Sequence, residues 1–424
     1  MSSDANVWAA AEDGNVDILL ALVKGMTDVN AEDQTRRTAL HYAALRGHTD
    51  IVQLLLDAKA AGDVGDKKGV RPLQLAASGG HHAVMRRLIA AKALVDAKDR
   101  KGRTALHDAV ERRQSTVIPI LLEAKASVDI KDNRGITPLH YAAECGDVAS
   151  VRMLLEANAT IDAPEVKEMK TPLHCAAAAG RVPVILVLIS ARANVNARSS
   201  YDGTPLHLAA CNGHPAAMQA LIDAKAIVEA KHQSLETPIH MAAYRGHSAA
   251  VQLLLEAKAT ANATCRGDQT PLHTAAWGGH TAAVRFLVDG KAEVNARDNR
   301  DMAALHFATL CGHKDVVQIL VDAKAALDLA TSSGSTPVYR AASMGHSATL
   351  QVLVAAKACV DGQDSNGRTP LHVAAELNHH DVIKVLLDAK AAIDIENMDK
   401  RTALHVAAKE GHTHLIRLLL GSLL

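Results

Sequence analysis

Apolar residues recur along this chain in short blocks whose spacing is helical. One such block consists of Leu139, Ala142 and Ala143, and the next of Val148, Val151, Leu154 and Leu155. Each block forms one face of an amphipathic helix, and Gly146 between them predicts a tight turn. The pattern therefore predicts two short antiparallel helices, the first lined by small alanines that let a neighbouring helix approach closely.

The polar residues before these blocks mark where the unit begins. Asp132-Asn133-Arg134-Gly135 is typical turn sequence, in which Gly135 is free to adopt a positive φ. Thr137 is predicted to cap the first helix, and Pro138 follows at the first helical position, where its missing N–H costs nothing. The unit is a turn followed by two helices, and we expect the turn acids Asp33, Asp66, Asp99 and Asp132 to brace these turns.

The same unit returns about every 33 residues. The motif Thr-Pro-Leu-His, or a close variant, begins at Thr38, Thr104, Thr137, Thr171, Thr204, Thr237, Thr270, Thr369 and Thr402, with degraded copies at Arg71, Ala303 and Thr336. The interval is 33 residues except between Thr137 and Thr171, where it is 34. Aligning Gly14 with Gly47 adds an N-terminal unit, which gives thirteen repeats. So small a unit cannot bury its apolar face alone and must stack on its neighbours.

This period and motif resemble the ankyrin repeat family over essentially all 424 residues. The resemblance implies an all-α solenoid in which the turns project as a row of fingers and the first helices line a concave face. We expect a single array over residues 1–424, with an atypical N-terminal capping repeat at 1–32, central repeats at 33–391 and a C-terminal repeat at 392–424. Terminal repeats usually have a polar outer face, so the last repeat, which ends Leu423-Leu424, is predicted to be uncapped.

The composition of the chain argues against several classes of function. The chain carries 46 Lys+Arg and 46 Asp+Glu, so no net charge attracts it to nucleic acid, and we expect no nucleic-acid partner. Only 2% of residues are aromatic, which argues against a large cofactor pocket, and we expect no cofactor. The 6 cysteines form no CxxC pair and are expected to be free thiols. Without a leader or an apolar run of about 20 residues, the chain is predicted to be cytoplasmic, or nuclear, with no transmembrane segment.

Many of the 23 histidines fall in repeat register, which favours a structural role over chemistry. Ten are motif histidines: His41, His107, His140, His174, His207, His240, His273, His306, His372 and His405. Nine follow the inter-helix turn: His48, His81, His214, His247, His280, His313, His346, His379 and His412. No HExxH, Cys/His metal spacing, phosphate-binding Gly-rich loop or GxSxG elbow occurs. We expect no metal site and no enzyme activity.

Some repeats depart from the common motif, and these departures predict local differences in structure. In the third repeat Arg71 and Gln74 replace Thr and His, so the cap and the imidazole are predicted to be lost. In the fourth, Arg113 takes the Gly position, and Pro119 is predicted inside the second helix, where it would cost about 3 kcal/mol. That repeat is either a hinge or tolerated drift. Nine repeats have Lys, as at Lys59, where the family usually has Gly; these lysines are either caps or a cationic rail for an anionic filament or membrane.

Binding a partner requires only side chains on the first-helix face and the finger tips. The residue after the motif His and those three and four later share one face. In repeats eight to ten these positions include Tyr244, Arg245, Trp277, Phe307 and Leu310, and Tyr201 lies at a finger tip next to this run. Interface hot spots favour Trp, Tyr and Arg. We predict that these residues bind a protein, with Trp277 as anchor; the alternative for Phe307 is packing between repeats.

The sequence thus predicts a non-enzymatic protein-interaction scaffold or adaptor that uses its groove and fingers. The alternative is the targeting or regulatory portion of a larger protein, such as a channel, kinase or ubiquitin-ligase subunit. Two further contacts stay open: an acidic partner at the basic N-terminal finger tips, and self-association through the Leu-rich C-terminal end.

Overall fold

The computed structural model describes residues 3–25 and 28–421, and over those residues it is helical with no strand. The helices form thirteen pairs, so the all-α prediction is confirmed. The first helices are α1 (Ser3–Asp13), α3 (Ala39–Arg46), α5 (Pro72–Gly79), α7 (Ala105–Glu111), α9 (Pro138–Cys145), α11 (Pro172–Ala178), α13 (Pro205–Cys211), α15 (Pro238–Arg245), α17 (Pro271–Trp277), α19 (Ala304–Leu310), α21 (Pro337–Ser343), α23 (Pro370–Glu376) and α25 (Ala403–Lys409).

The second helices follow after each inter-helix turn. They are α2 (Val16–Gly25), α4 (Thr49–Asp57), α6 (His82–Ala90), α8 (Ile118–Glu123), α10 (Val148–Glu156), α12 (Val182–Ser190), α14 (Pro215–Asp223), α16 (Ser248–Glu256), α18 (Thr281–Asp289), α20 (Lys314–Asp322), α22 (Ser347–Ala355), α24 (His380–Asp388) and α26 (Thr413–Gly421). A 3₁₀ turn, η1 (Ser115–Val117), precedes α8.

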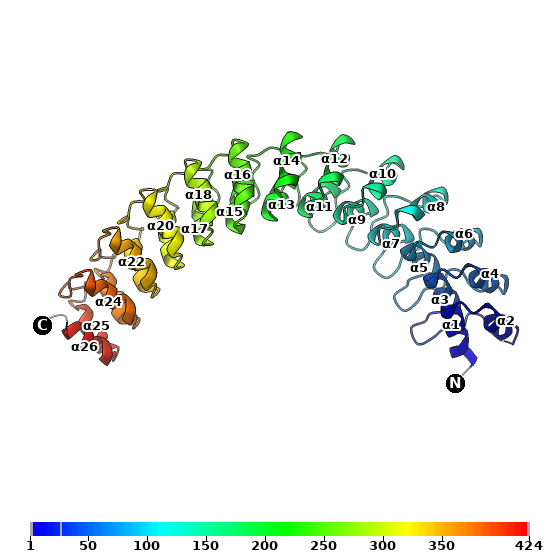
Figure 1. Ribbon diagram of the computed structural model, residues 1–424, viewed down its shortest axis with the longest axis horizontal. Helices are drawn as coiled ribbons and strands as arrows, with labels where there is room; N and C mark the ends of the chain where they lie inside the picture. Colours follow the sequence, from blue (N-terminus) through cyan, green and yellow to red (C-terminus); the bar gives the residue numbers. More distant parts are fainter. Residues whose placement is uncertain (1–2, 26–27, 422–424) are drawn as a thin grey trace. The chain divides into compact units, whose positions relative to one another are not determined.

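Packing divides the chain into two compact units. Unit 1 comprises Met1–Ala209 and Ala216–Ala226, and unit 2 comprises Ala210–Pro215 and Ile227–Leu424. Within each unit the first helices pack on one another in chain order, and the second helices form a row of their own (Figure 1). The core lies between these rows, where motif leucines and paired alanines such as Leu139 and Ala142 are fully buried. The boundaries 1–32, 33–391 and 392–424 stay predictions.

Eight of the motif histidines join their repeat to the next one. In repeat 4, His107 Nδ1 accepts the backbone N–H of Thr104 at 3.2 Å, and Nε2 donates to the carbonyl of Ile136 at 3.2 Å. A backbone N–H can only donate and a carbonyl can only accept, so the ring must be neutral with its proton on Nε2. The same two bonds are made by His41, His140, His174, His240, His273, His306 and His372.

The electrostatics of the motif histidines agree with the neutral form. Burial lowers the pKa of His107, and it lowers the pKa of His174, His240 and His306 to about 4. Desolvation disfavours the charged ring, and no hydrogen bond to the backbone reverses that effect. These side chains are therefore uncharged links between repeats at neutral pH.

Repeat 3 keeps this link with a different side chain. Gln74 Oε1 accepts the N–H of Arg71 at 3.1 Å, and Nε2 donates to the carbonyl of Arg103 at 3.0 Å. The imidazole is absent, as the sequence shows, but the link between the repeats is kept because a primary amide offers the same acceptor and donor.

A second set of histidines bonds backward to the preceding repeat. His313 Nε2 donates to the carbonyl of Trp277 at 2.9 Å, and its ring covers Gly279, whose φ is 70°. A Cβ on Gly279 would lie 2.6 Å from His313 Nδ1. Glycine is thus required at this position for two reasons: the backbone is left-handed, and the His313 ring fills the space that a Cβ would occupy. The same pairing recurs at Gly14/His48, Gly47/His81, Gly213/His247, Gly246/His280, Gly312/His346 and Gly345/His379.

Repeat 4 differs from the sequence prediction. Pro119 does not lie inside a second helix, because the segment starts as the 3₁₀ turn η1 and α8 begins only at Ile118. Pro119 therefore falls in the first α-helical turn, where its missing N–H costs little. Arg113 adopts a left-handed φ of 57° at the Gly position, and its guanidinium donates to the carbonyl of Cys145. The helix is shortened rather than broken.

The lysines after the second helices also keep a left-handed backbone. Lys59, Lys92 and the seven others have φ between 62° and 68°. Each retains the conformation for which the family usually selects Gly, at a cost of roughly 1 kcal/mol. The backbone requirement is therefore met without glycine.

The dual requirement at the Gly–His pairs gives a double-mutant test. Gly279→Ala is expected to lower the free energy of unfolding by about 2–4 kcal/mol, since a strained φ and a clash with His313 add up. In a His313→Ala background the same change should cost only about 1 kcal/mol, because the clash is gone. Urea unfolding followed by circular dichroism measures both.

Gly411→Ala is the control for the backbone effect alone. Its φ is 77°, but nothing lies within 4 Å of a Cβ there. It should therefore cost about 1 kcal/mol. An equal loss for Gly279→Ala with and without His313 would contradict the packing argument.

Candidate functional site

Two aromatic side chains stay exposed on successive first helices of unit 2. Tyr244 on α15 and Trp277 on α17 occupy the same repeat position and are 54% and 48% exposed. Phe307 on α19 is only 1% exposed, and its ring centroid lies 5.5 Å from that of Trp277. Phe307 thus packs between repeats, as the alternative interpretation states, and it supports the exposed indole from below.

Trp277 and Arg300 line two hollows in unit 2. The first, of about 350 Å³, also involves Tyr244, Phe307, Thr274, Gln269 and His273, and we call it the Tyr244 hollow. The second, of about 320 Å³, also involves Arg340, Met302, Leu310, Thr331, Ser332 and Ser333, and we call it the Arg340 hollow. The indole ring contributes to the wall of both.

The other residues predicted to bind a partner have different positions. Arg245 is exposed, and its guanidinium carbon lies 5.8 Å from the ring centre of Tyr244. Leu310 is half-buried and lines the Arg340 hollow. Tyr201 belongs to unit 1, where its ring is 54% exposed at the finger that precedes α13. Within unit 2, the structure therefore brings Tyr244, Trp277 and Phe307 to one hollow.

The finger acids brace their own turns, as predicted. Asp132 Oδ1 accepts the backbone N–H groups of Arg134 at 2.9 Å and Ile136 at 2.8 Å. The other oxygen, Oδ2, accepts the hydroxyl of Tyr141 at 3.0 Å, nine residues further on. Asp33 and Tyr42 repeat the arrangement at 2.6 Å. The tyrosine after the motif histidine thus completes the finger beneath it.

Repeat 10 lacks this last bond. Asp298 Oδ1 accepts two backbone N–H groups at 2.8 Å, but Oδ2 is buried and has no hydrogen bond from any described residue. A guanidinium nitrogen of Arg300 lies 3.7 Å from Oδ2, beyond hydrogen-bonding distance. The residue in the tyrosine position is Phe307, which has no hydroxyl. The sequence analysis did not identify this gap, although a comparison of Phe307 with Tyr42 and Tyr141 in register would have done so.

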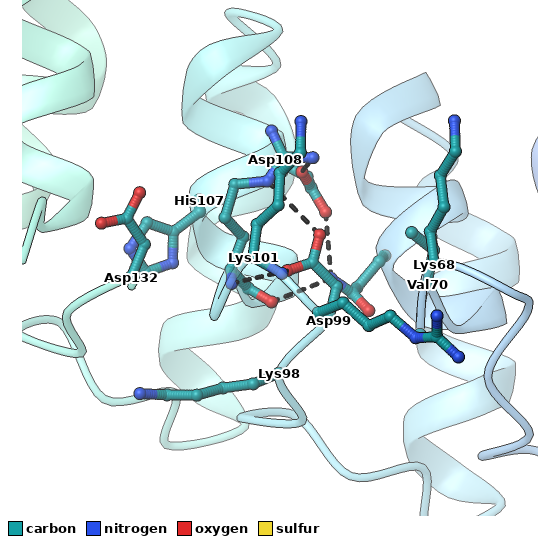
Figure 2. Close-up of polar contacts among 12 residues, drawn as sticks. Lys68, Val70, Lys98, Asp99, Lys101, His107, Asp108 and Asp132 are labelled. Carbon is teal, nitrogen blue, oxygen red and sulfur yellow. Dashed lines mark hydrogen bonds and ion pairs between the residues drawn. The ribbon is translucent and has the colours of Figure 1, made fainter. Parts of the chain in front are cut away.

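Unit 1 contains a charged cluster that sequence reasoning missed. Arg103 lies 3.4 Å from carboxylate oxygens of Asp99 and Asp108 and 2.6 Å from one of Glu111. Figure 2 shows Asp99 and Asp108 in this cluster. Gln74 Nε2 donates to Asp108 Oδ2 at 3.2 Å. An imidazole Nε2 has one hydrogen, whereas this amide has two, so the glutamine in repeat 3 requires the acceptor that Asp108 supplies.

The electrostatic state of Asp108 follows from its surroundings. Burial raises the pKa of Asp108 to about 6, although the positive charge of Arg103 acts in the opposite direction. The negative charge of the nearby Asp99 acts on the pKa of Asp108 in the same direction as burial. Removing the carboxylate from water therefore outweighs its ion pair.

The last repeat ends in a partly exposed apolar surface. Leu420 is 45% exposed, and a hollow of about 190 Å³ is lined by Leu404, Leu419 and Ile393 with two polar neighbours. Leu423 and Leu424 lie outside the described residues. Self-association through this end stays a prediction.

Stacked helix pairs, most of them linked to a neighbouring repeat by a histidine hydrogen bond, define the molecule as a helical solenoid. A family model described as ankyrin repeats (3 copies) matches it in overlapping stretches at residues 7–99, 59–132, 90–165, 118–199, 162–232, 190–266, 206–298, 240–331, 291–364 and 356–423. The chain belongs to the ankyrin repeat family, whose repeats are generally protein–protein interaction modules. No curated protein matches the chain.

Two other kinds of site are absent from the residues that the structure describes. No cluster of three or more His, Cys, Asp or Glu side chains there is placed to hold a metal ion. In the same residues, no helix has the length and apolarity that a bilayer span requires.

The missing hydroxyl in repeat 10 can be restored. Phe307→Tyr is expected to raise the free energy of unfolding by about 1 kcal/mol, because its hydroxyl would donate to the buried Asp298 Oδ2. Tyr42→Phe is the reciprocal control and should lower stability by a similar amount. Urea denaturation measures both, and a destabilised Phe307→Tyr variant would show that the gap cannot accept the oxygen.

Asp108 gives a pH-dependent prediction. Its folded pKa lies above the unfolded value of about 3.9, so ionisation lowers stability as the pH rises from about 4 through 6. Asp108→Asn, which cannot ionise, should be about 1–3 kcal/mol more stable than the parent at pH 7.5. The difference should vanish near pH 4. Thermal unfolding across this range measures the profile.

Glu111→Gln is the matched control in that cluster. It removes another carboxylate from Arg103, but at a side chain that is 38% exposed. Its effect should therefore stay below about 1 kcal/mol. Lower stability of Asp108→Asn at pH 7.5 would mean that the ion pair with Arg103 outweighs burial.

Proposed function

We propose that the chain is a non-enzymatic scaffold or adaptor that binds protein partners. The contact surface comprises Tyr244, Arg245, Trp277 and Leu310 in unit 2, with Phe307 as its buried support. The observation that carries the proposal is the exposure of two large aromatic rings at one repeat position, beside a hollow of about 350 Å³. Exposed Trp and Tyr around a pocket are typical of interface hot spots.

A binding surface that is held rigid by hydrogen bonds between repeats supports the proposed role as a scaffold. The motif histidine His273 bonds forward to the carbonyl of Met302 and the turn histidine His313 bonds backward to the carbonyl of Trp277, so that α17, which carries Trp277, is held at both ends by the neighbouring repeat. A receptor surface that is ordered before binding loses little conformational entropy when a partner arrives. Tyr201 at its finger tip is a further contact in the same proposal, and the chain would act in the cytoplasm or nucleus.

Loss of the aromatic pair tests the proposal. Affinity capture from a lysate with the intact chain and with Tyr244→Ala/Trp277→Ala should show at least one protein that only the intact chain retains. Truncation of hot-spot aromatics costs about 2 kcal/mol or more each, which is enough to remove a micromolar partner. Mass spectrometry with quantification against the intact chain identifies it.

Leu94→Ala/Leu186→Ala is the matched control. Both leucines are large, apolar and exposed, at 60% and 52%, but they lie in unit 1. This variant should capture the same proteins as the parent, and circular dichroism checks that all variants are folded. If both double variants behave alike, the aromatic surface of unit 2 is not the contact.

A further inference from the structure

Repeat 11 carries a cation at a position where two other repeats carry a tyrosine. Nine residues after the finger acid stands Tyr42 in repeat 2 and Tyr141 in repeat 5, but Arg340 in repeat 11. The finger acid itself is also replaced in this repeat, by Thr331. Its hydroxyl accepts the N–H of Ser335 at 3.2 Å and takes over part of the turn bracing. The same repeat has therefore gained an arginine and lost the carboxylate in register with it.

Other arginines in this region of the repeat have carboxylate partners. Arg103 contacts three carboxylates, and Arg368 lies 3.0 Å from Asp364 and 3.3 Å from Glu376. Arg340 makes no ion pair with any described residue, and its Nε is buried without a hydrogen bond. A buried guanidinium N–H without an acceptor costs free energy that a suitable acceptor would recover.

The hollow around Arg340 has the composition of an anion site. Arg300 and Arg340 both line it, with hydroxyl groups from Thr331, Ser332 and Ser333. In the described structure no carboxylate lines this hollow or the adjoining Tyr244 hollow. The finger acid of the preceding repeat, Asp298, lies 3.7 Å from Arg300, but its side chain is fully covered. The accessible charge in the Arg340 hollow is therefore positive.

The indole of Trp277 indicates which kind of residue would lie next to an anion bound in the Arg340 hollow. Its half-exposed indole forms part of the walls of both hollows, so a chain that enters the Arg340 hollow passes the ring. An apolar side chain beside the anion would pack on the indole, while the anion would reach the guanidinium of Arg340.

We propose that the Arg340 hollow binds an anionic side chain, a carboxylate or a phosphate, of a partner peptide whose neighbouring apolar residue packs on Trp277. This assignment rests on the proposed function, because it gives the chemistry of the partner that the Trp277 surface binds. The complementary charge comes from the partner because repeat 11 does not supply it.

Selection of short random peptides displayed on phage, with the full chain as bait, tests the assignment. Selected peptides should be enriched in Asp or Glu adjacent to a large apolar residue. In a synthetic copy of a selected peptide, Glu→Gln at the enriched position should weaken binding about tenfold, the size expected for a charge-assisted hydrogen bond. Fluorescence anisotropy measures the dissociation constant.

Two variants identify the arginine. Arg340→Thr should weaken binding of the acidic peptide about tenfold. This variant should bind the Glu and Gln forms of the peptide equally. Thr331→Asp keeps Arg340 but supplies the in-register carboxylate that other fingers have, and it should weaken binding similarly. Since this aspartate reproduces a natural finger, the second variant tests the idea even if Arg340→Thr folds poorly. Arg285→Thr on α18, an exposed arginine of unit 2 outside both hollows, is the matched control and should bind normally.

A phosphoserine peptide distinguishes the two anions. Tighter binding than the glutamate peptide assigns the hollow to a phosphate, and equal or weaker binding assigns it to a carboxylate; loss of binding by Arg340→Thr supports the proposal in either case. Peptides that depend on Trp277 but carry no enriched acid would overturn this inference and leave the proposed function standing. Peptides that bind the Tyr244→Ala/Trp277→Ala variant as well as the parent would overturn both.

Discussion

The neutral imidazole of the motif histidine is the interaction on which the array depends. It must accept a backbone N–H at the start of its own helix and donate to a carbonyl of the next repeat, and only the Nε2–H form does both. Burial holds the pKa of His174 and His240 near 4. Because the unfolded chain binds protons at these rings below about pH 6.5, this ladder loses stability as the pH falls toward 4. Asp108 contributes with the opposite sign, since its charged form is the one that burial disfavours.

Repeat register turns this local requirement into a rule for neighbouring side chains. A ring from one repeat fills the space over the glycine of the previous one, as at Gly279 and His313. When Gln74 replaces the histidine, its extra N–H is accepted by Asp108 from the following repeat. The substitution in repeat 3 is thus matched by a side chain about one period away. In repeat 10 no such match exists, because Phe307 has no hydroxyl, and Asp298 Oδ2 has no hydrogen bond from any described residue.

The repeat period allowed the helix pairs, the turn bracing and the structural role of most histidines to be predicted, because each depends on contacts at a fixed spacing. Other features depend on contacts between particular residues, and the repeat period could not predict them. Pro119 lies in a first turn because η1 shifts the helix start by a few residues. Periodicity placed Tyr244, Trp277 and Phe307 on one face but not at one depth: Phe307 fits beneath the indole, whereas the tyrosines stay near solvent or reach a finger acid. The cluster around Arg103 could not be predicted, because periodicity does not show which carboxylates lie around one guanidinium.

A solenoid can tolerate such exceptions because its stability is approximately a sum over repeats and their interfaces. The absent hydroxyl at Phe307 and the unpaired Nε of Arg340 each cost on the order of 1–3 kcal/mol, which is spread over thirteen helix pairs. In a compact single-core domain the same defects would take a large fraction of the total stability. Repeats 10 and 11 keep their backbone geometry, since Asp298 and Thr331 still brace the fingers. The fold therefore keeps the geometry of repeats 10 and 11 although Asp298 Oδ2 and Arg340 Nε have no hydrogen bond from the described residues, and the proposed binding surface lies on this unchanged backbone.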